Sequence, residues 1–331
     1  MRYGLIWIGA LVVSSACGST SSPTAPAGSS VVVVTPPSIP VPTVTTIGHV
    51  TATNGGQPLS GLSVDLAGKG ATTTDGSGAF RYTTTGGGSA RLTLTGGGIL
   101  PRSLVLAVNA TRDVAIDAIS LTGGFDPAFY RQLVRNAFDA PADIQALRRW
   151  TRTPSIYLKT VDEAGEAIHG PTLDLIESTA KAAIPEWTSG KLGVPVVERG
   201  TASREGQSGW ITIKFPADAA TTSCGRAQVG FEGGWIELSY LVPVSGPINC
   251  RVTGVVIAPL VVRHELGHAL GFWHTDSAKD VMWSGAWSNP GLTPSARELV
   301  AAAIAYRRPV GNADPDTDPS SVVSLAPMSV R

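Results

Sequence analysis

The sequence predicts an α/β (α+β) domain with a mixed sheet, preceded by a small all-β domain. Residues 44–120 contain short runs with apolar alternation that Gly-rich turns separate, a pattern typical of antiparallel strands. From residue 121 to 310 the order changes to helix, strand, helix, strands, helix, helix, which indicates helices packed on a mixed sheet. The 331 residues, 43% hydrophobic and 15% charged, suffice for two packed domains.

The N-terminus has the features of an export signal. Arg2 supplies a positive charge, an apolar run follows from Leu5 to Val13, and small residues precede Cys17. The run is too short to span a bilayer. We expect residues 1–17 to be a signal that ends at Cys17, in a stretch that resembles a bacterial lipobox, so that Cys17 takes the lipid. The alternative is an ordinary secretory signal cleaved nearby. Either way the protein is exported, as a cell-envelope lipoprotein or secreted, and reaches a membrane only through the lipid anchor.

Two segments of biased composition flank the predicted domains. Residues 18–43 are rich in Pro, Ser and Thr, which is typical of a flexible linker. Residues 311–331 are polar and rich in Pro and Asp, and we expect a disordered tail there.

The all-β unit contains a turn that joins two of its strands. Thr74-Asp75-Gly76-Ser77-Gly78-Ala79-Phe80 places glycines at turn positions and an aromatic residue where the next strand enters the core. Residues 48–82 resemble the transthyretin-like, or carboxypeptidase-regulatory-like, β-sandwich. The resemblance implies a fold and little about function. The expected strands are Thr46–Ala52, Leu62–Leu66, Gly78–Tyr82, Ala90–Leu94 and Leu104–Val108.

The second domain begins with a helix over residues 125–138, for which Asp126-Pro127 supplies the N-cap and first turn. An apolar run at 255–272, with Pro259 near its start, predicts the helix that carries the candidate site. The other expected elements are strands at 155–161, 210–215, 226–231 and 235–240, and helices at 171–184 and from Thr293-Pro294 to about Tyr306.

Three of the five histidines of the chain lie within eleven residues of one another. His264 and His268 are four residues apart, so a helix presents both imidazoles on one face, within reach of one zinc ion. Gly271 lets the backbone turn after the helix, and His274 can return as a third ligand. Three neutral imidazoles leave a fourth position for water, which is typical of catalytic zinc. Glu265 follows the first ligand and is the candidate general base.

This eleven-residue segment resembles the zinc signature of the metzincin peptidases. Members of that family have a methionine turn beneath the metal, and Met282, eight residues after His274, corresponds to it. The short spacing is similar to that of matrixins, and a weaker resemblance to bacterial matrixin-like peptidases covers residues 125–310. The resemblance implies a zinc endopeptidase whose extended substrate lies along a sheet edge, for which Arg226–Phe231 is the candidate.

Cysteine usage agrees with export. With Cys17 lipidated, Cys224 and Cys250 remain as one pair, which an oxidising compartment lets bond; the alternative is two buried thiols. Asp162, Glu163 and Glu166 could form a structural calcium site, although a solvated acidic turn is favoured.

The sequence therefore predicts a zinc-dependent endopeptidase that acts on a protein or peptide, with water activated by zinc and Glu265. Lys and Arg together number 25, as do Asp and Glu, and this lack of a basic excess argues against nucleic-acid binding. The alternative functions are a non-catalytic surface or adhesion protein, or a wall-binding lipoprotein, that keeps the metzincin fold.

Overall fold

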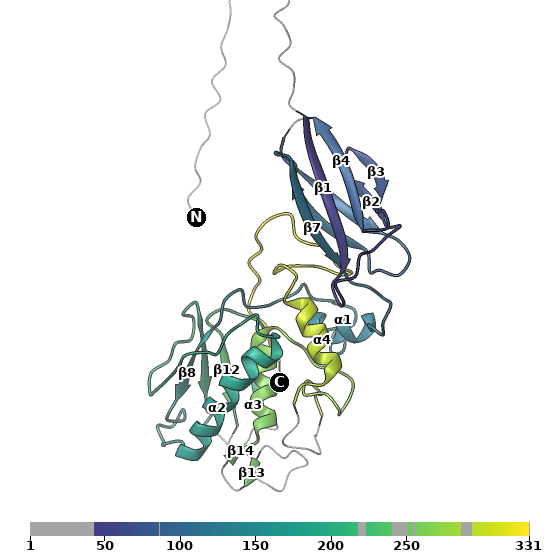
Figure 1. Cartoon of the computed structure of the whole chain (residues 1–331). Coiled ribbons are helices and arrows are strands. Elements are labelled where there is room, and N and C mark those ends of the chain that lie inside the picture. Colours follow the sequence, from purple (N-terminus) through teal and green to yellow (C-terminus); the bar gives the residue numbers. More distant parts are fainter. Residues whose placement is uncertain are drawn as a thin grey trace, which may run out of the picture. The chain divides into compact units, whose positions relative to one another are not determined.

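A six-stranded mixed sheet forms the frame of the second domain (Figure 1). The computed structural model describes residues 43–85, 87–217, 223–239, 251–253, 256–285 and 293–330. The strand order is β15-β11-β12-β10-β8-β9; β9, β8, β10 and β12 are parallel, whereas β11 and β15 are antiparallel to their neighbours. The mixed sheet was predicted. Its strands are β8 (Ser155–Lys159), β9 (Val197–Gly200), β10 (Trp210–Lys214), β11 (Gly225–Gln228), β12 (Trp235–Leu238) and β15 (Ser329–Val330).

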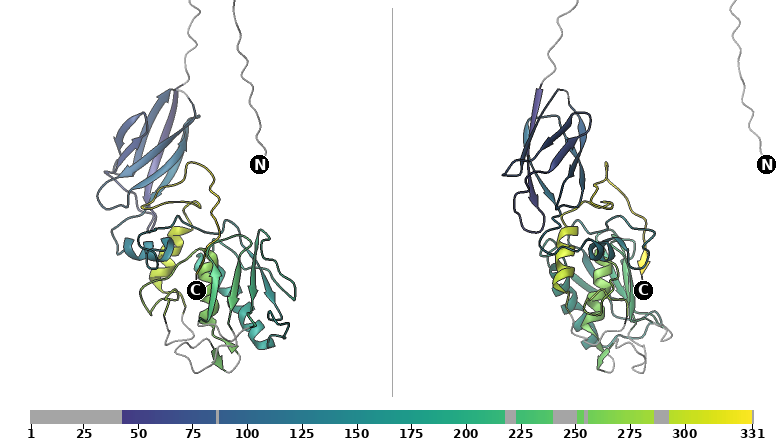
Figure 2. Two further views of the ribbon diagram at one scale, coloured as in Figure 1. Left: turned by 180° about the vertical axis from the view of Figure 1, so that it is seen from behind. Right: turned by 90° about the vertical axis from the view of Figure 1, so that its right-hand side faces the viewer.

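Two helices pack against each other and share a core with this sheet (Figure 2). They are α2 (Gly170–Trp187) and α3 (Pro259–Leu270). Trp187, at the end of α2, is fully buried, and its indole Nε1–H donates to the Arg263 carbonyl of α3 at 3.2 Å. Strand β10 is covered on both faces, because Ile211 and Ile213 are fully buried on one face and Thr212 is fully buried on the other.

The other two helices begin with side-chain caps. In α1 (Pro127–Arg135) the Asp126 carboxylate accepts from the N–H groups of Ala128 and Phe129, as the Asp-Pro pair predicted. The fourth helix, α4 (Ala296–Ala305), begins after Ser295 rather than at Thr293, because Ser295 and Glu298 form a reciprocal capping box. A short hairpin of β13 (Arg251–Thr253) and β14 (Val256–Ile257) precedes α3, and the helix begins at Pro259, where the sequence predicted its start.

The all-β unit is built from two sheets with a core of its own. The turn residue Asp75 accepts from the N–H groups of Ser77 and Ala79, and Phe80 is 4% exposed, so both residues have the expected structural roles. Two strands were not predicted: β3 has no buried residue, and charged residues interrupt the apolar pattern of β7. One sheet contains β4 (Ala79–Thr85), β1 (Thr43–Ala52) and β7 (Arg112–Ala118); the other contains β3 (Gly70–Thr73), β2 (Ser63–Leu66), β5 (Ser89–Thr95) and β6 (Arg102–Ala107).

The segment 311–331, expected to be a disordered tail, has a defined structure between residues 311 and 330. Asp316 is fully buried, and its carboxylate accepts from Arg308 Nε at 2.7 Å. Asp318 accepts a bidentate pair of bonds from Arg102, at 2.6 and 2.7 Å. The prediction was wrong because composition marks Asp as solvated, whereas here buried arginines pair with the carboxylates.

Several predictions concern residues outside the described ranges. They are the signal at 1–17 with the lipid acceptor Cys17, all but the last residue of the linker 18–43, and Cys250, and these stay predictions. No described helix combines the length and the apolar character that a bilayer crossing needs.

Candidate metal centre

Helix α3 and the turn after it position the three histidines. His264 and His268 lie one turn apart on the helix and are 3% and 0% exposed. Gly271 ends the helix with φ of 113°, a left-handed conformation that favours glycine. A Cβ at this position would also clash with the carbonyl oxygen of Arg148. This turn brings in His274, which is 4% exposed.

The Nδ1 atoms of the three imidazoles all face hydrogen-bond acceptors. His264 Nδ1 lies 2.7 Å from the carbonyl oxygen of Val281, and His268 Nδ1 lies 2.8 Å from that of Phe272. His274 Nδ1 lies 2.8 Å from Oδ2 of Asp139. A carbonyl oxygen can only accept, so in His264 and His268 the Nδ1 atom carries the hydrogen. In the neutral ring, Nε2 is then unprotonated and carries a lone pair that can bind a metal ion.

These lone pairs converge on one point. The Nε2 atoms of His264 and His268 are 3.1 Å apart, an arrangement that is repulsive unless a cation lies between them. Within the described part of the chain, the buried Nε2 of His274 has no hydrogen-bond partner. Two nitrogens bound to one tetrahedral ion at about 2.0–2.1 Å are about 3.3–3.4 Å apart, close to the separation here. The three histidines can therefore hold a metal ion, and the ligand atoms lie within 4.8 Å of one another.

The surroundings keep these rings neutral. Burial, and then the nearby His274, lower the pKa of His264 to about 3. Burial, together with the neighbouring histidines, also holds the pKa of His268 well below its usual value. A metal ion binds the neutral form of imidazole, so no proton has to leave these rings before binding.

Glu265 is buried beside the histidines and faces strand β11. It is 3% exposed, and a Cβ built on Gly225 would lie 2.7 Å from its Oε1 atom. Among the described residues, its Oε2 atom has no hydrogen-bond partner. Burial, and then the charge of Glu237, raise the pKa of Glu265 well above its usual value. Such a carboxyl group favours the proton-bound form more than an exposed one does.

Met282 packs against helix α3 at Gly267, which lies between the two helical ligands in the sequence. It is fully buried, and a Cβ on Gly267 would lie 2.4 Å from its sulfur, so the Met282 side chain packs directly on the helix backbone. Its N–H donates to Oε1 of Glu298 at 2.9 Å, and the N–H of Val281 donates to Oε2 at 3.1 Å. Glu298 therefore holds the turn whose Val281 carbonyl orients His264.

A second carboxylate attaches the same loop to α4. Asp280 is fully buried and accepts from the hydroxyl of Thr275 at 3.0 Å and from that of Ser295 at 2.8 Å. It also pairs with the guanidinium of Arg297. The loop between the third histidine and Met282 is thus fixed at both ends, and this limits the freedom of His274.

Two supporting residues were not identified from the sequence. Asp139 lies in the loop after α1, and nothing in its local sequence distinguishes it from other loop carboxylates. Glu298 could have been found, because Ser295 and Glu298 have the spacing of a capping box. No local pattern connects that box with Met282.

The other candidate residues from the sequence lie outside the histidine cluster. Asp162 is buried, and its Oδ1 accepts from the N–H groups of Ala164 and Glu166 at 2.9 Å, which is the role of a turn cap. Among the described residues, the three histidines are the group of His, Cys, Asp or Glu placed to hold a metal. Cys224 is 6% exposed, and its pairing with Cys250 stays a prediction because Cys250 is outside the described ranges.

Comparisons with known proteins give no family. No family model matches the chain, and no curated protein matches it significantly. Metalloproteinase-II from Bacteroides fragilis is 13% identical over 78% of this chain and 84% of that chain, with a TM-score of 0.31. A cohesin–X-dockerin complex from Acetivibrio cellulolyticus is 19% identical over 26% of this chain and 66% of that chain, with a TM-score of 0.21. A 5-hydroxyisourate hydrolase from Klebsiella pneumoniae is 17% identical over 22% of this chain and 84% of that chain, with a TM-score of 0.19. At these TM-scores we base no conclusion about function on the similarities.

Proposed function

We propose that the chain is a zinc endopeptidase, with His264, His268 and His274 as ligands and Glu265 as general base. The observation that carries the proposal is the convergence of the three Nε2 atoms next to a buried carboxyl group. A set of three neutral imidazoles is typical of catalytic zinc, because it leaves a coordination position open. A structural zinc site would instead have four protein ligands.

Zinc, when bound, would supply a Lewis acid that polarises the substrate carbonyl and lowers the pKa of a bound water. The chain itself supplies the proton transfers. Glu265 follows His264 on the helix and points about 100° away from the face that the two helical ligands share. It accepts the proton of the attacking water and passes that proton to the amine that leaves.

The outer edge of β11 is the surface on which we place the substrate. Gly225, at the start of this strand, approaches Glu265, and the N–H of Gly230, just beyond its end, donates to the carbonyl oxygen of His268 at 3.0 Å. The strand therefore passes along the candidate site. A sheet edge binds an extended peptide through main-chain hydrogen bonds, which suits a protein or peptide substrate of varied sequence.

The test combines metal analysis with two substitutions. We expect about one zinc per chain, and loss of peptide cleavage when a chelator removes it. Glu265→Gln keeps the shape of the side chain but cannot take up a proton, so it should retain zinc and lose at least about 10²-fold in turnover. His268→Ala should lose the metal as well.

The control is Glu166→Gln, which removes an exposed carboxylate distant in sequence from the site. It should match the wild type in zinc content and in turnover. A Glu265→Gln variant that cleaves a peptide as fast as the wild type would refute the assigned mechanism. Full zinc content without cleavage of any peptide in a library would instead favour a non-catalytic surface protein.

A further inference from the structure

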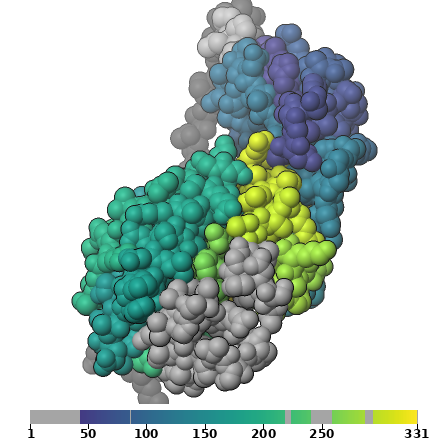
Figure 3. Space-filling model, turned by 60° about the horizontal axis from the view of Figure 1, so that its bottom comes forward, coloured from purple at the N-terminus to yellow at the C-terminus, as the bar shows by residue number. Residues whose placement is uncertain are grey.

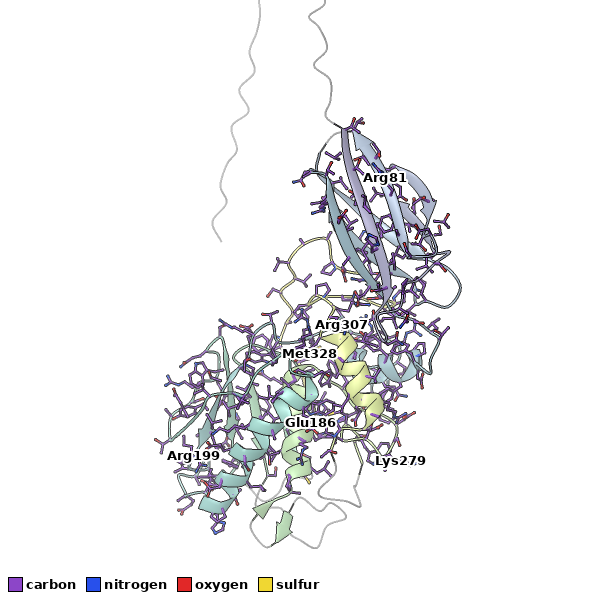
Figure 4. All side chains as sticks on the ribbon, in the orientation of Figure 1. Arg81, Glu186, Arg199, Lys279, Arg307 and Met328 are labelled. Atoms are coloured by element: carbon purple, nitrogen blue, oxygen red, sulfur yellow. The ribbon has the colours of Figure 1, made fainter. Side chains whose placement is uncertain are left out.

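The C-terminal segment of the chain lies on the edge of the sheet at which we place the substrate. Strand β15 pairs antiparallel with β11, so that Val330 lies opposite Ala227 and Ser329 opposite Gln228 (Figure 2). One residue earlier, the carbonyl of Met328, labelled in Figure 4, accepts from the N–H of Val229 at 2.8 Å. These main-chain contacts are the type that an extended peptide would make on the same strand.

The direction of the segment points towards the catalytic carboxyl group. The β11 residues that carry the segment lie between Gly225, which approaches Glu265, and Gly230, which bonds to the carbonyl of His268. Because the pairing is antiparallel, the chain from Met328 to Val330 runs from the His268 end of this stretch towards the Glu265 end. A substrate strand on this edge would meet the segment directly.

The segment is held at its two ends and loosely between them. Its anchor is the buried carboxylate of Asp316, with Asp318 next to it. From Pro319 to Val330 the residues are exposed or half-buried, and Val322 is fully exposed. In Figure 3, residues near the C-terminal end, in yellow, lie at the surface beside the teal residues of the sheet domain.

A cavity of about 560 Å³ is lined jointly by this part of the segment and by the body of the domain. Val322 and Leu325 line one side of the cavity, and Phe231 and Arg149 line the other. Before β15, the segment is also held by a bond from Arg148 to the carbonyl of Ala326, at 2.7 Å. A segment with few buried contacts opens at low free energy, whereas the anchor at residues 316–318 stays in place.

From these contacts we infer that residues 319–330 are a resident competitor of the substrate, which occupies the edge of β11 and must leave before a peptide binds. This inference rests on the proposed function. One net backbone hydrogen bond corresponds to a factor of about 5 in an equilibrium. The occupied form should therefore exceed the open form by at least about 5-fold, and the KM for a peptide should be raised by the same factor.

Two variants of the full-length protein test the inference. In the first, the chain ends at Asp318, which retains the anchor and removes the competitor. In the second, Ser329→Pro with Val330→Pro keeps the length and disrupts the strand, and it removes the N–H of Val330, the main-chain donor of this pair that faces β11 in the observed register. The matched control is Ser329→Ala with Val330→Ala, which leaves the backbone donors intact. We expect KM to fall about 5-fold in the first two variants, with kcat within about twofold of the wild type, and no change in the control.

Hydrogen exchange at the amide of Val229 gives a readout that does not depend on activity. It should be at least about 5-fold faster in the chain that ends at Asp318, and a synthetic peptide with the sequence of residues 323–330, added at about 5 mM, should slow it again. If exchange changes in this way and no form cleaves any peptide, the occupied edge is real and the proposed function is wrong. If cleavage depends on Glu265 but KM and the exchange of Val229 stay within twofold of the wild type, the inference is wrong. Self-association of the shortened chain without a change in KM would also overturn it, because the segment would then only protect a sheet edge.

Discussion

The hydrogen bond between Asp139 and His274 gives the sharpest test of how the metal site is held. Asp139 Oδ2 lies 2.8 Å from Nδ1 of His274. A carboxylate in this position fixes the ring and makes its other nitrogen a stronger donor to the metal. Asp139→Asn keeps an oxygen acceptor at the same place and removes only the charge. The variant should therefore fold normally and bind zinc less tightly.

The expected loss of zinc affinity depends on how deeply the Asp139–His274 pair is buried. Loss of such a supporting partner typically costs 10- to 100-fold in metal affinity. The side chain of Asp139 is 36% exposed, so water screens part of its charge. We therefore expect the dissociation constant for zinc to rise about 10-fold in Asp139→Asn, which is about 1.4 kcal/mol. Asp139→Ala also removes the hydrogen bond and should approach about 100-fold.

The assay is a competition titration for zinc against a chelator of known affinity, at one pH and ionic strength. Thermal unfolding of the metal-free proteins checks that the fold is intact. The control is Asp143→Asn, which removes the same charge from an exposed residue of the same loop. A zinc affinity of Asp139→Asn within twofold of that of the control would refute this account of the site.

Two further predictions concern stability. Arg308 is fully buried and pairs with the buried Asp316 and the half-buried Asp117, so Arg308→Met should lower the free energy of unfolding in urea by about 3 kcal/mol, because Asp117 loses this ion pair and Asp316 keeps only that with Arg102. Arg307→Met, at the exposed neighbouring residue labelled in Figure 4, should cost less than about 1 kcal/mol, and equal losses in the two variants would contradict this assignment. Burial raises the pKa of Glu298 to about 7, so between pH 4.5 and 7 the folded metal-free protein holds a proton that the unfolded chain has released. The free energy of unfolding of the wild type should therefore fall as the pH rises through this range. The fall should exceed that of Glu298→Gln by on the order of 3 kcal/mol. Parallel pH profiles of the two proteins would show that the carboxyl group does not titrate in this way.

The features that were predicted correctly from the sequence depend on local patterns of residues. Pro259 and Gly271 define the ends of α3, and the four-residue spacing of His264 and His268 places them on one face, so this part of the site follows from a short segment. The N-cap of α1 at Asp126 was predicted for the same reason. By contrast, strand β3 has no buried residue and therefore no alternation that a sequence pattern could detect.

What the sequence did not predict depends on contacts between distant residues. Asp139 and His274 are 135 positions apart, and only the packing of the loop after α1 brings them together. The order of residues 311–330 depends in part on such contacts, because the buried Asp316 pairs with Arg102, 214 positions away, as well as with the nearby Arg308. A rule based on composition treats such aspartates as solvated, and it fails where arginines enclose them.

The supports of the three histidines come from separate parts of the fold. His268 is held by the carbonyl of Phe272 at the end of its own helix, whereas His264 depends on Val281 and, through it, on Glu298 of α4. His274 depends on the loop after α1. An isolated segment of α3 and the turn after it would lack two of these three supports, so its affinity for a metal should be lower than that of the folded domain. Strand β11 adds a further dependence, because the edge that carries residues 329 and 330 belongs to the strand whose Gly225 approaches Glu265. Access to the edge and the position of Glu265, the proposed general base, therefore depend on one strand, and a change that moves β11 should alter both together.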